Sequence, residues 1–136
     1  MLYTTSVYQT RRDILVVEEP MIRRKNEVVS ERHDHKFGGE GYIVVDSLIT
    51  SDKEFNGKGR AFCHTTLQPG CEIGFHQHHG ESEIYYFLTG EGKFNDDGSI
   101  VDISAGDVTF TFDGQGHGVK NTGNVPMEII AVILYA

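Results

Sequence analysis

A short stretch of the sequence concentrates side chains that can bind metal ions. Residues 74–92, GFHQHHGESEIYYFLTGEG, contain His76, His78, His79 and Glu83 immediately before an aromatic run typical of a β-strand. Imidazole nitrogens and carboxylate oxygens are the donors that borderline divalent ions such as Mn, Fe, Co, Ni and Zn prefer. The stretch is therefore either a solvated loop or a metal-binding segment.

The spacing of these side chains is compatible with a common site. Residues two apart in a strand share a face, so His76 and His78 can point in the same direction. Glu83 opens the next strand after the short link 79–82, and it returns close to the two histidines if the two strands are antiparallel neighbours. A fourth donor must then come from elsewhere, and His117 in GQGHGVKN is the leading candidate. An isolated H-x-H pair is more often a solvated loop, but the flanking glycines and the second histidine segment favour a site.

Both segments resemble the two sequence motifs of the cupin family. The first runs from Gly70 to Gly90 with the spacing G-x5-H-x-H-x4-E-x6-G, and the second runs from Gly106 to Asn121 with the spacing G-x5-x-x-G-x2-H-x3-N. One position departs from the family pattern, because Phe112 stands where the second motif usually has proline. The resemblance covers residues 59–136. The altered position leaves the potential ligands intact and puts only the local turn geometry in question.

The resemblance implies both a fold and a metal site. The fold is a small jelly-roll-like β-barrel, and the metal is one divalent transition ion per chain (Mn, Fe, Co, Ni or Zn). Its implied ligands are His76, His78, Glu83 and His117, with two further coordination positions open to water or substrate. In the family, the asparagine that corresponds to Asn121 has a structural role, so we expect it to hydrogen-bond to the backbone.

Several neighbouring residues are candidates for a place beside the metal. Tyr85 and Phe87 share strand parity with Glu83, so they either line a pocket or belong to the core. Tyr85 is the better pocket candidate because its ring has a polar tip. His79 should face away from His78, toward solvent or behind the ligands, since adjacent strand residues face opposite sides.

Three other histidines have less defined roles. His64 lies on the preceding strand, where parity does not decide between the inside and the outside. His33 and His35 form another H-x-H pair in SERHDHKFGG, and we expect them to lie on a solvated arm.

The elements that must position these residues are strands. Alternating and β-branched runs recur every eight to twelve residues between Gly, Asn and Asp turns, and no window has a sustained helical period. This spacing is typical of an all-β barrel or sandwich. The expected strands are Leu2–Tyr8, Ile14–Glu18, Gly41–Thr50, Arg60–Leu67, Glu72–His76, Glu83–Thr89, Gly92–Phe94, Ile100–Ile103, Asp107–Phe112, Gly118–Asn121 and Met127–Tyr135.

Two segments lack strand patterning. Residues 19–40 are charged and are expected to form an extended arm or loop, and residues 51–58 a polar loop that could cover the barrel mouth. We expect a single cupin domain over residues 1–136, in which residues 1–40 supply N-terminal strands and the arm, and residues 41–136 form the barrel core. The N-terminal strands carry more apolar side chains than a solvated arm needs, and compact cupins are commonly dimers. We therefore expect a homodimer in which this segment pads or extends the partner's sheet.

Composition excludes several classes of function. The chain has 136 residues and a net charge of −8, which argues against nucleic-acid or anionic-membrane partners. No apolar run is long enough to span a membrane, and the N-terminus lacks the pattern of a secretory signal, so a cytoplasmic location is expected. Cys63 and Cys71 fit no metal or disulfide pattern and are expected to be reduced thiols.

Two functions from different classes follow. The first is a metal-dependent enzyme, a decarboxylase, dioxygenase or isomerase acting on a small polar or carboxylate substrate. Compact cupins of this pattern are grouped with oxalate-decarboxylase-like proteins. Decarboxylation of that kind also needs a proton-donating carboxylate near the metal, for which Glu54 and Glu72 are available without any feature that selects either. The alternative is a non-catalytic binding module for a sugar or small acid in which the metal is structural, because one fold hosts both kinds of protein.

Overall fold

A computed structural model describes the backbone of residues 5–9, 14–18 and 21–136, and side chains from residue 21 onward. Strands dominate, as predicted, and the two helical elements are single 3-10 turns, η1 (Lys25–Glu27) and η2 (Lys36–Gly38). The expected strand at Leu2–Tyr8 falls partly outside the described residues. Its described part belongs to β1 (Thr5–Gln9), which pairs with β2 (Ile14–Glu18) in a two-stranded sheet of its own.

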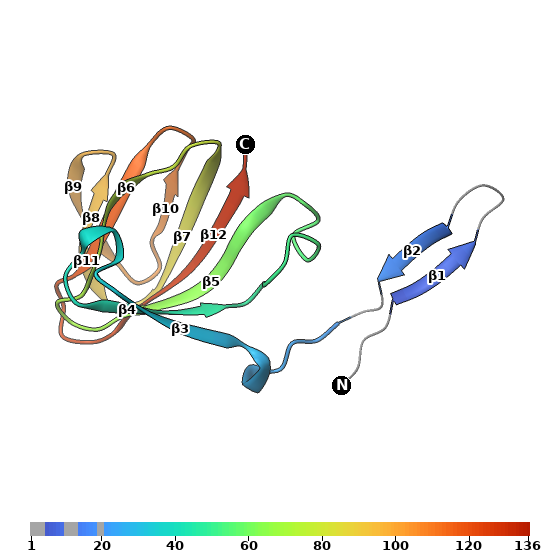
Figure 1. The fold of residues 1–136 in the computed structure, drawn as a ribbon. Coiled ribbons are helices and arrows are strands. Elements are labelled where there is room, and N and C mark those ends of the chain that lie inside the picture. Colours follow the sequence, from blue (N-terminus) through green and yellow to red (C-terminus); the bar gives the residue numbers. More distant parts are fainter. Residues whose placement is uncertain (1–4, 10–13, 19–20) are drawn as a thin grey trace.

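Two antiparallel sheets form the body of the molecule (Figure 1). The larger has six strands in the order β10-β7-β12-β5-β4-β3. Their bounds are β3 Val29–Asp34, β4 Tyr42–Ser47, β5 Gly59–Leu67, β7 Glu81–Thr89, β10 Val108–Thr111 and β12 Met127–Tyr135. The smaller sheet has the order β6-β11-β8-β9, with bounds β6 Glu72–Gln77, β8 Glu91–Asp96, β9 Ser99–Ser104 and β11 Gly116–Asn121.

The core lies between these two sheets, because alternate residues of each strand point inward. Phe87 and Ile129 from the larger sheet and Phe94 and Val119 from the smaller one are almost fully buried there. The predicted all-β jelly-roll fold is confirmed.

One strand was missed by the sequence prediction. Residues 19–40 were expected to form an arm or loop, but Val29–Asp34 form β3, which pairs with β4 along its whole length. The reason is physical: β3 is an edge strand that is mostly exposed, so its sequence VSERHD shows no apolar alternation. Pairing with β4, which no local pattern reveals, makes it a strand.

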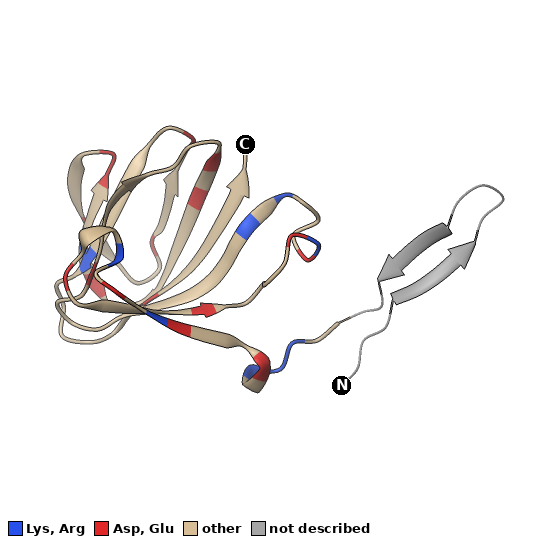
Figure 2. Cartoon of the chain, viewed as in Figure 1, with Lys and Arg blue, Asp and Glu red and all other residues tan. Residues whose placement is uncertain are grey.

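The expected loop at residues 51–58 is a series of turns in the structure. Arg23 contacts it, with Nη1 2.6 Å from the carboxylate of Glu54 and 2.7 Å from the carbonyl oxygen of Leu48. Acidic and basic residues are interspersed over the described body of the protein (Figure 2). Within the residues that the structure describes, no helix has the length and hydropathy needed to cross a membrane.

Candidate metal centre

The four predicted ligands come together from three strands and one adjoining turn. His76 lies on β6 and His78 directly follows that strand, while His117 on β11 is the cross-strand partner of His76. Glu83 lies on β7 in the other sheet. The expectation that Glu83 returns on an antiparallel neighbour of the histidine strand is therefore wrong. Glu83 reaches the histidines across the interior, because the chain changes sheets between β6 and β7.

The donor atoms of the four residues converge closely. One donor atom from each residue can be chosen so that all four lie within 4.8 Å of one another. Oε1 of Glu83 lies 2.8 Å from Nε2 of His117 and 3.1 Å from Nε2 of His78. The two Nε2 atoms are themselves 3.1 Å apart. Neighbouring ligands of one ion bound at about 2.1 Å, at right angles to each other, are separated by about 3 Å, so this donor set fits a single divalent metal.

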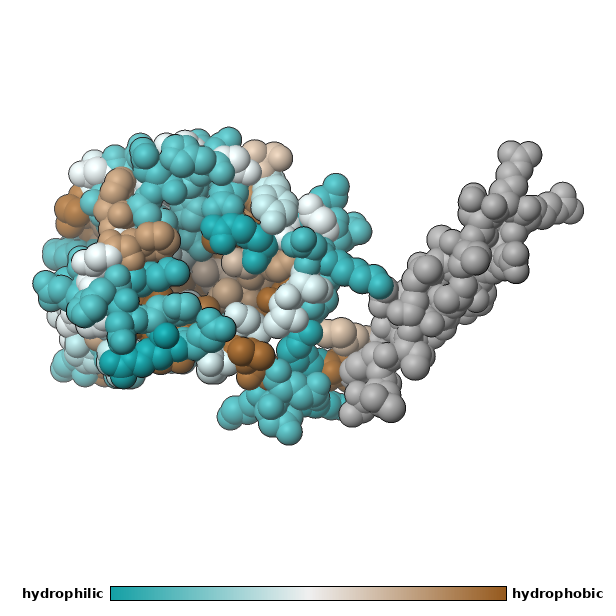
Figure 3. All heavy atoms as spheres, viewed as in Figure 1, coloured by the Kyte–Doolittle hydropathy of each residue, from teal (hydrophilic) through white to brown (hydrophobic). Residues whose placement is uncertain are grey.

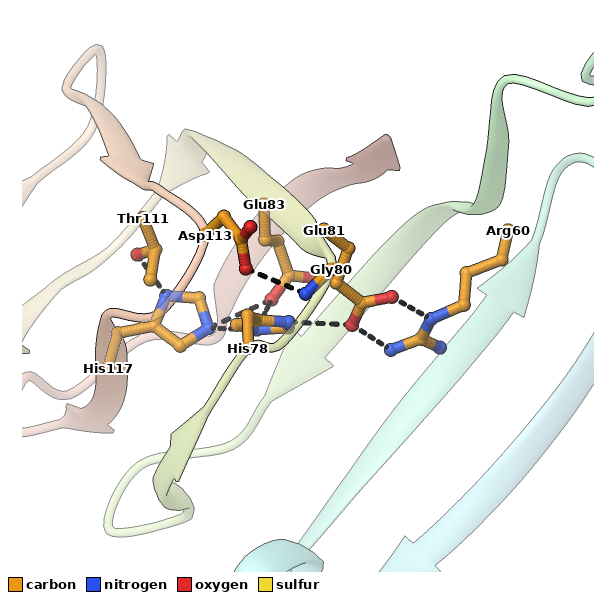
Figure 4. A network of polar contacts seen from close by, with 8 residues as sticks. All are labelled: Arg60, His78, Gly80, Glu81, Glu83, Thr111, Asp113 and His117. Carbon is orange, nitrogen blue, oxygen red and sulfur yellow. Dashed lines mark hydrogen bonds and ion pairs between the residues drawn. The ribbon is translucent and has the colours of Figure 1, made fainter. Parts of the chain in front are cut away.

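The other ring nitrogen of each histidine is engaged by the protein. Nδ1 of His76 donates to the carbonyl oxygen of Gly74 at 2.8 Å, and Nδ1 of His117 pairs with the hydroxyl of Thr111 at 2.7 Å. Nδ1 of His78 donates to Glu81 at 2.9 Å (Figure 4). Such contacts fix ring orientation and leave Nε2 as the donor available to a metal.

Glu81 is in turn held by Arg60. Nε and Nη2 of Arg60 each lie 2.6 Å from a different oxygen of Glu81, which makes a bidentate ion pair (Figure 4). The hydrogen bonds from Arg60, together with that from His78, hold the pKa of Glu81 at about 2 against the effect of burial. Sequence reasoning missed Arg60, Glu81 and Thr111 as parts of this site. Arg60 lies on a strand 21 residues before Glu81, so nothing local to it signals the contact, whereas Thr111 lies only six residues before its partner His117.

Electrostatics around Glu83 favour a charged carboxylate. Burial alone raises the pKa of Glu83, but hydrogen bonds from His117 and His78 outweigh it and hold the pKa at about 2. The hydrogen bond to Glu83 also raises the pKa of His78. Burial lowers the pKa of His76 to about 4, so His76 is a neutral imidazole at physiological pH. The anionic oxygen of Glu83 and the neutral imidazole of His76 are in the states that a divalent ion requires.

The cluster opens into a cavity of about 240 Å³ between the sheets. On the face of the molecule drawn in Figure 3, apolar residues (brown) lie between hydrophilic residues (teal). Tyr85 lines the cavity, and its ring stacks on His117 with the ring centres 4.8 Å apart. Of the two alternatives that the sequence left open for Phe87, the structure supports the core, where Phe87 packs against Phe94. Parity alone did not distinguish these two positions.

Four exposed or half-buried lining residues form what we call the cavity mouth: His33, Lys36, Phe37 and Arg60. The ring of Phe37 stacks on His76 with the ring centres 3.9 Å apart. His33 and His35 were expected on a solvated arm. Instead, His33 projects from β3 into the mouth, and His35 donates from Nδ1 to the carbonyl oxygen of Gly39.

The remaining histidines lie away from the donor cluster. His79 is exposed, as expected from its parity with His78. His64 bridges two carboxylates, with Nδ1 3.0 Å from Asp46 and Nε2 3.0 Å from Glu128. Neither His64 nor its two partners line the cavity. The side chain of His64, whose direction the sequence left undecided, therefore points away from the cavity.

The second motif keeps its geometry despite the change at Phe112. The backbone N–H that proline would lack donates to the side-chain oxygen of Gln115 at 3.0 Å, so the turn gains a hydrogen bond. Asn121 has the predicted structural role: its amide donates to the carbonyl oxygens of Leu67 and Val125 and accepts from the N–H of Gly123. The motif glycines all have positive φ, a conformation that favours glycine: Gly70, Gly90, Gly106 and Gly114.

Comparisons with known proteins agree with this fold. The Cupin domain family matches residues 63–133. The oxalate-binding protein of Thermotoga maritima is 44% identical over 114 residues, which cover 84% of this chain and 93% of that protein.

Solved structures show the same relationship. The crystal structure of a predicted oxalate decarboxylase from Thermotoga maritima superposes with a TM-score of 0.80 at 43% identity, and the match covers 85% of this chain and 100% of the other. The cupin domain of Schizosaccharomyces pombe Cnp3 shares the fold at 10% identity, with a TM-score of 0.67 over 98% of this chain and 88% of the other. The chain belongs to the cupin family.

Proposed function

We propose that this protein binds a small dicarboxylate, with oxalate as the leading candidate, through one divalent transition metal per chain. The proposed ligands of the metal are His76, His78, Glu83 and His117. The observation that carries the proposal is the convergence of Glu83 with the Nε2 atoms of His78 and His117 at 2.8–3.1 Å beside the cavity between the sheets. A bound divalent ion would supply a positive centre that a carboxylate oxygen can ligate.

The charges around the cavity support an anionic ligand. Glu83 is the one carboxylate among the described residues that line it, whereas Lys36 and Arg60 are basic. Arg60 commits Nε and Nη2 to Glu81 and makes no further hydrogen bond within the described part of the chain. Its Nη1 is therefore an available donor at the cavity mouth. The chain as a whole carries −8, so this local excess of donors distinguishes the mouth from the rest of the protein.

The acids available for proton transfer favour binding over decarboxylation. Replacing the CO₂ lost from oxalate with hydrogen consumes one proton, which needs a donor near the metal. Glu54 is paired with Arg23, and Glu72 accepts from the backbone N–H of Glu40. Neither residue lines the cavity. Both candidates from the sequence are thus engaged elsewhere, which supports a binding role for the site.

The test begins with elemental analysis of protein purified without added metal. Calorimetric titration with oxalate then follows, on metal-loaded and metal-stripped protein. We expect oxalate to bind only the loaded form, His76→Ala to lose both metal and oxalate, and His79→Ala, an exposed neighbour, to keep both. Oxalate binding of equal strength to the stripped protein would contradict the proposal.

Catalysis is the second candidate: a metal-dependent decarboxylase, dioxygenase or isomerase. The observation that favours catalysis is Tyr85, which lines the cavity. Burial and the nearby Glu83 raise the pKa of its phenol, so the phenol keeps its proton. Incubating the loaded protein with oxalate in air, with assays for formate, CO₂ and hydrogen peroxide, separates the candidates. We expect oxalate to be recovered unchanged, whereas stoichiometric formate and CO₂ would establish a decarboxylase.

The cytoplasmic location, the lack of nucleic-acid partners and the homodimer remain predictions from the sequence.

A further inference from the structure

The inner surface of the six-stranded sheet carries small side chains next to the candidate metal centre. Two rows of cross-strand neighbours run over this surface, one through Ala61, Ile133 and Glu83 and the next through Cys63, Ala131 and Tyr85. The interior of a small barrel is normally filled by side chains, with large residues alternating with small ones. Here the small residues Ala61, Cys63 and Ala131 occupy neighbouring positions, so the sheet leaves a hollow beside Glu83 and Tyr85.

The cavity of about 240 Å³ includes this hollow, and the larger sheet gives it an apolar wall. We call the hydrophobic side chains of this sheet that line the cavity the inner wall: Ile43, Val45, Ala61, Ile129, Ala131 and Ile133. Burial raises the pKa of the Cys63 thiol, so this thiol adds no charge beside them. The acidic and basic lining residues are Glu83 at the ligand cluster and Lys36 and Arg60 at the mouth. The cavity therefore has a polar end and an apolar end.

This cavity is larger than oxalate needs. A cavity of about 150 Å³ lined by aliphatic and aromatic side chains is already large enough to bind benzene. Oxalate consists of two carboxylates and has no apolar part, so its oxygens belong near the metal ligands and the basic mouth. It would leave the hollow beside Ala131 to water, which finds few hydrogen-bond partners on an apolar wall. An alkyl group is the better occupant of this part of the cavity.

We propose that the hollow is a second subsite, which takes a short alkyl chain attached to the metal-binding head of the ligand. The ligand class is then a 2-oxo acid with an aliphatic chain. Such an acid carries oxygens on two adjacent carbons, as oxalate does, and has an alkyl ketone in place of the second carboxylate. Ala61, Cys63 and Ala131 make room for the chain and so determine specificity. This inference rests on the proposed binding of a carboxylate at the metal.

Calorimetric titration of the metal-loaded protein with 2-oxo acids of different chain length tests the subsite. Pyruvate and 2-oxopentanoate share one head, and the second has two more methylenes. Each methylene moved from water to an apolar wall strengthens binding about fourfold, so we expect 2-oxopentanoate to bind about 15-fold more tightly than pyruvate. 2-Oxoglutarate has the same chain length but a charged end, and we expect it to bind at least about tenfold more weakly than 2-oxopentanoate.

A variant that fills the hollow locates the alkyl chain. Ala131→Leu places a larger side chain there and leaves the proposed metal ligands in place. It should reduce the preference for 2-oxopentanoate over pyruvate to less than about threefold. Ala105→Leu, the same change at an exposed turn residue, is the matched control and should keep the wild-type preference. If Ala131→Leu does not fold, Ala61→Val repeats the test in the neighbouring row.

Oxalate is titrated in parallel, so that the two proposals can fail separately. If oxalate binds while pyruvate and 2-oxopentanoate have equal affinities, the subsite is rejected and the proposed function stands. A preference for 2-oxopentanoate that Ala131→Leu leaves unchanged would also reject the subsite, because the chain would then lie elsewhere. Tighter binding of 2-oxoglutarate than of 2-oxopentanoate would place the chain at the basic mouth and reject it too. If neither oxalate nor any 2-oxo acid binds, the proposed function fails and the subsite fails with it.

Discussion

The imidazole of His78 is held in place by a carboxylate behind it: Nδ1 lies 2.9 Å from Oε1 of Glu81. Glu81 is immobilised by the two-point contact with Arg60. The chain Arg60–Glu81–His78 therefore fixes the direction in which Nε2 of His78 points. A carboxylate behind a histidine also makes its free nitrogen a better metal donor. Arg60 and Glu81 act on the site through His78.

The first prediction concerns Glu81. Glu81→Gln should weaken metal binding by about 10–100-fold, because the amide neither carries the charge that polarises His78 nor pairs with Arg60 as an ion. Competition with a chelator of known affinity measures the change. Glu91→Gln, an exposed carboxylate on β8, is the control and should bind metal like the wild type. Unchanged affinity in a folded Glu81→Gln protein would show that the Glu81 contact plays no part in metal binding.

The second prediction concerns protons released on metal binding. His76 is already neutral above pH 5, because burial holds its pKa at about 4. His78 has a raised pKa, so the metal must displace a proton from it, and affinity should fall as pH falls below 7. We expect His76 to contribute none of the protons released on metal binding above pH 5. Calorimetry in buffers of different ionisation enthalpy counts them, and release of three would contradict the neutral His76.

The third prediction concerns Asn121, which is fully buried. Asn121→Ala removes the partners of the Leu67 and Val125 carbonyls and of the Gly123 N–H. Leaving buried groups unpaired should lower the free energy of unfolding by about 2–4 kcal/mol. Denaturant titration of the metal-free protein tests this. Asn124→Ala, at an exposed position in the same turn, should change it by less than about 0.5 kcal/mol.

The fourth prediction concerns acid stability. Arg23, with smaller contributions from Ser51 and Thr50, lowers the pKa of Glu54 to about 2. The ion pair between Arg23 and Glu54 therefore stabilises the folded state at pH values above the ordinary carboxyl pKa. This stabilisation is lost as the pH falls from about 4.5 to 2. Glu54→Gln should therefore cost about 0.5–1 kcal/mol at pH 7, a modest value because the pair is near the surface. At pH 2 the variant and the wild type should be equally stable in denaturant titrations. A difference that persists unchanged at pH 2 would reject the ion pair as its source.

The sequence by itself indicated the four potential metal ligands of the candidate site. Ligand spacing within each motif is local: His76 and His78 share a face because strand geometry repeats every two residues, and positive-φ turns take glycine wherever the chain reverses. The same locality explains why most strands were predicted within one or two residues of their observed bounds. Asn121 could be assigned a backbone role because its motif position carried that information.

Only the tertiary structure decided how distant segments meet. Glu83 reaches the histidines from the opposite sheet, and Arg60 reaches Glu81 from β5, because packing two sheets places residues together that no local pattern connects. β3 could not be predicted because an exposed edge strand needs no apolar alternation. Tyr85 and Phe87 have the same parity, and only their depth along β7 places one ring beside His117 and the other in the core.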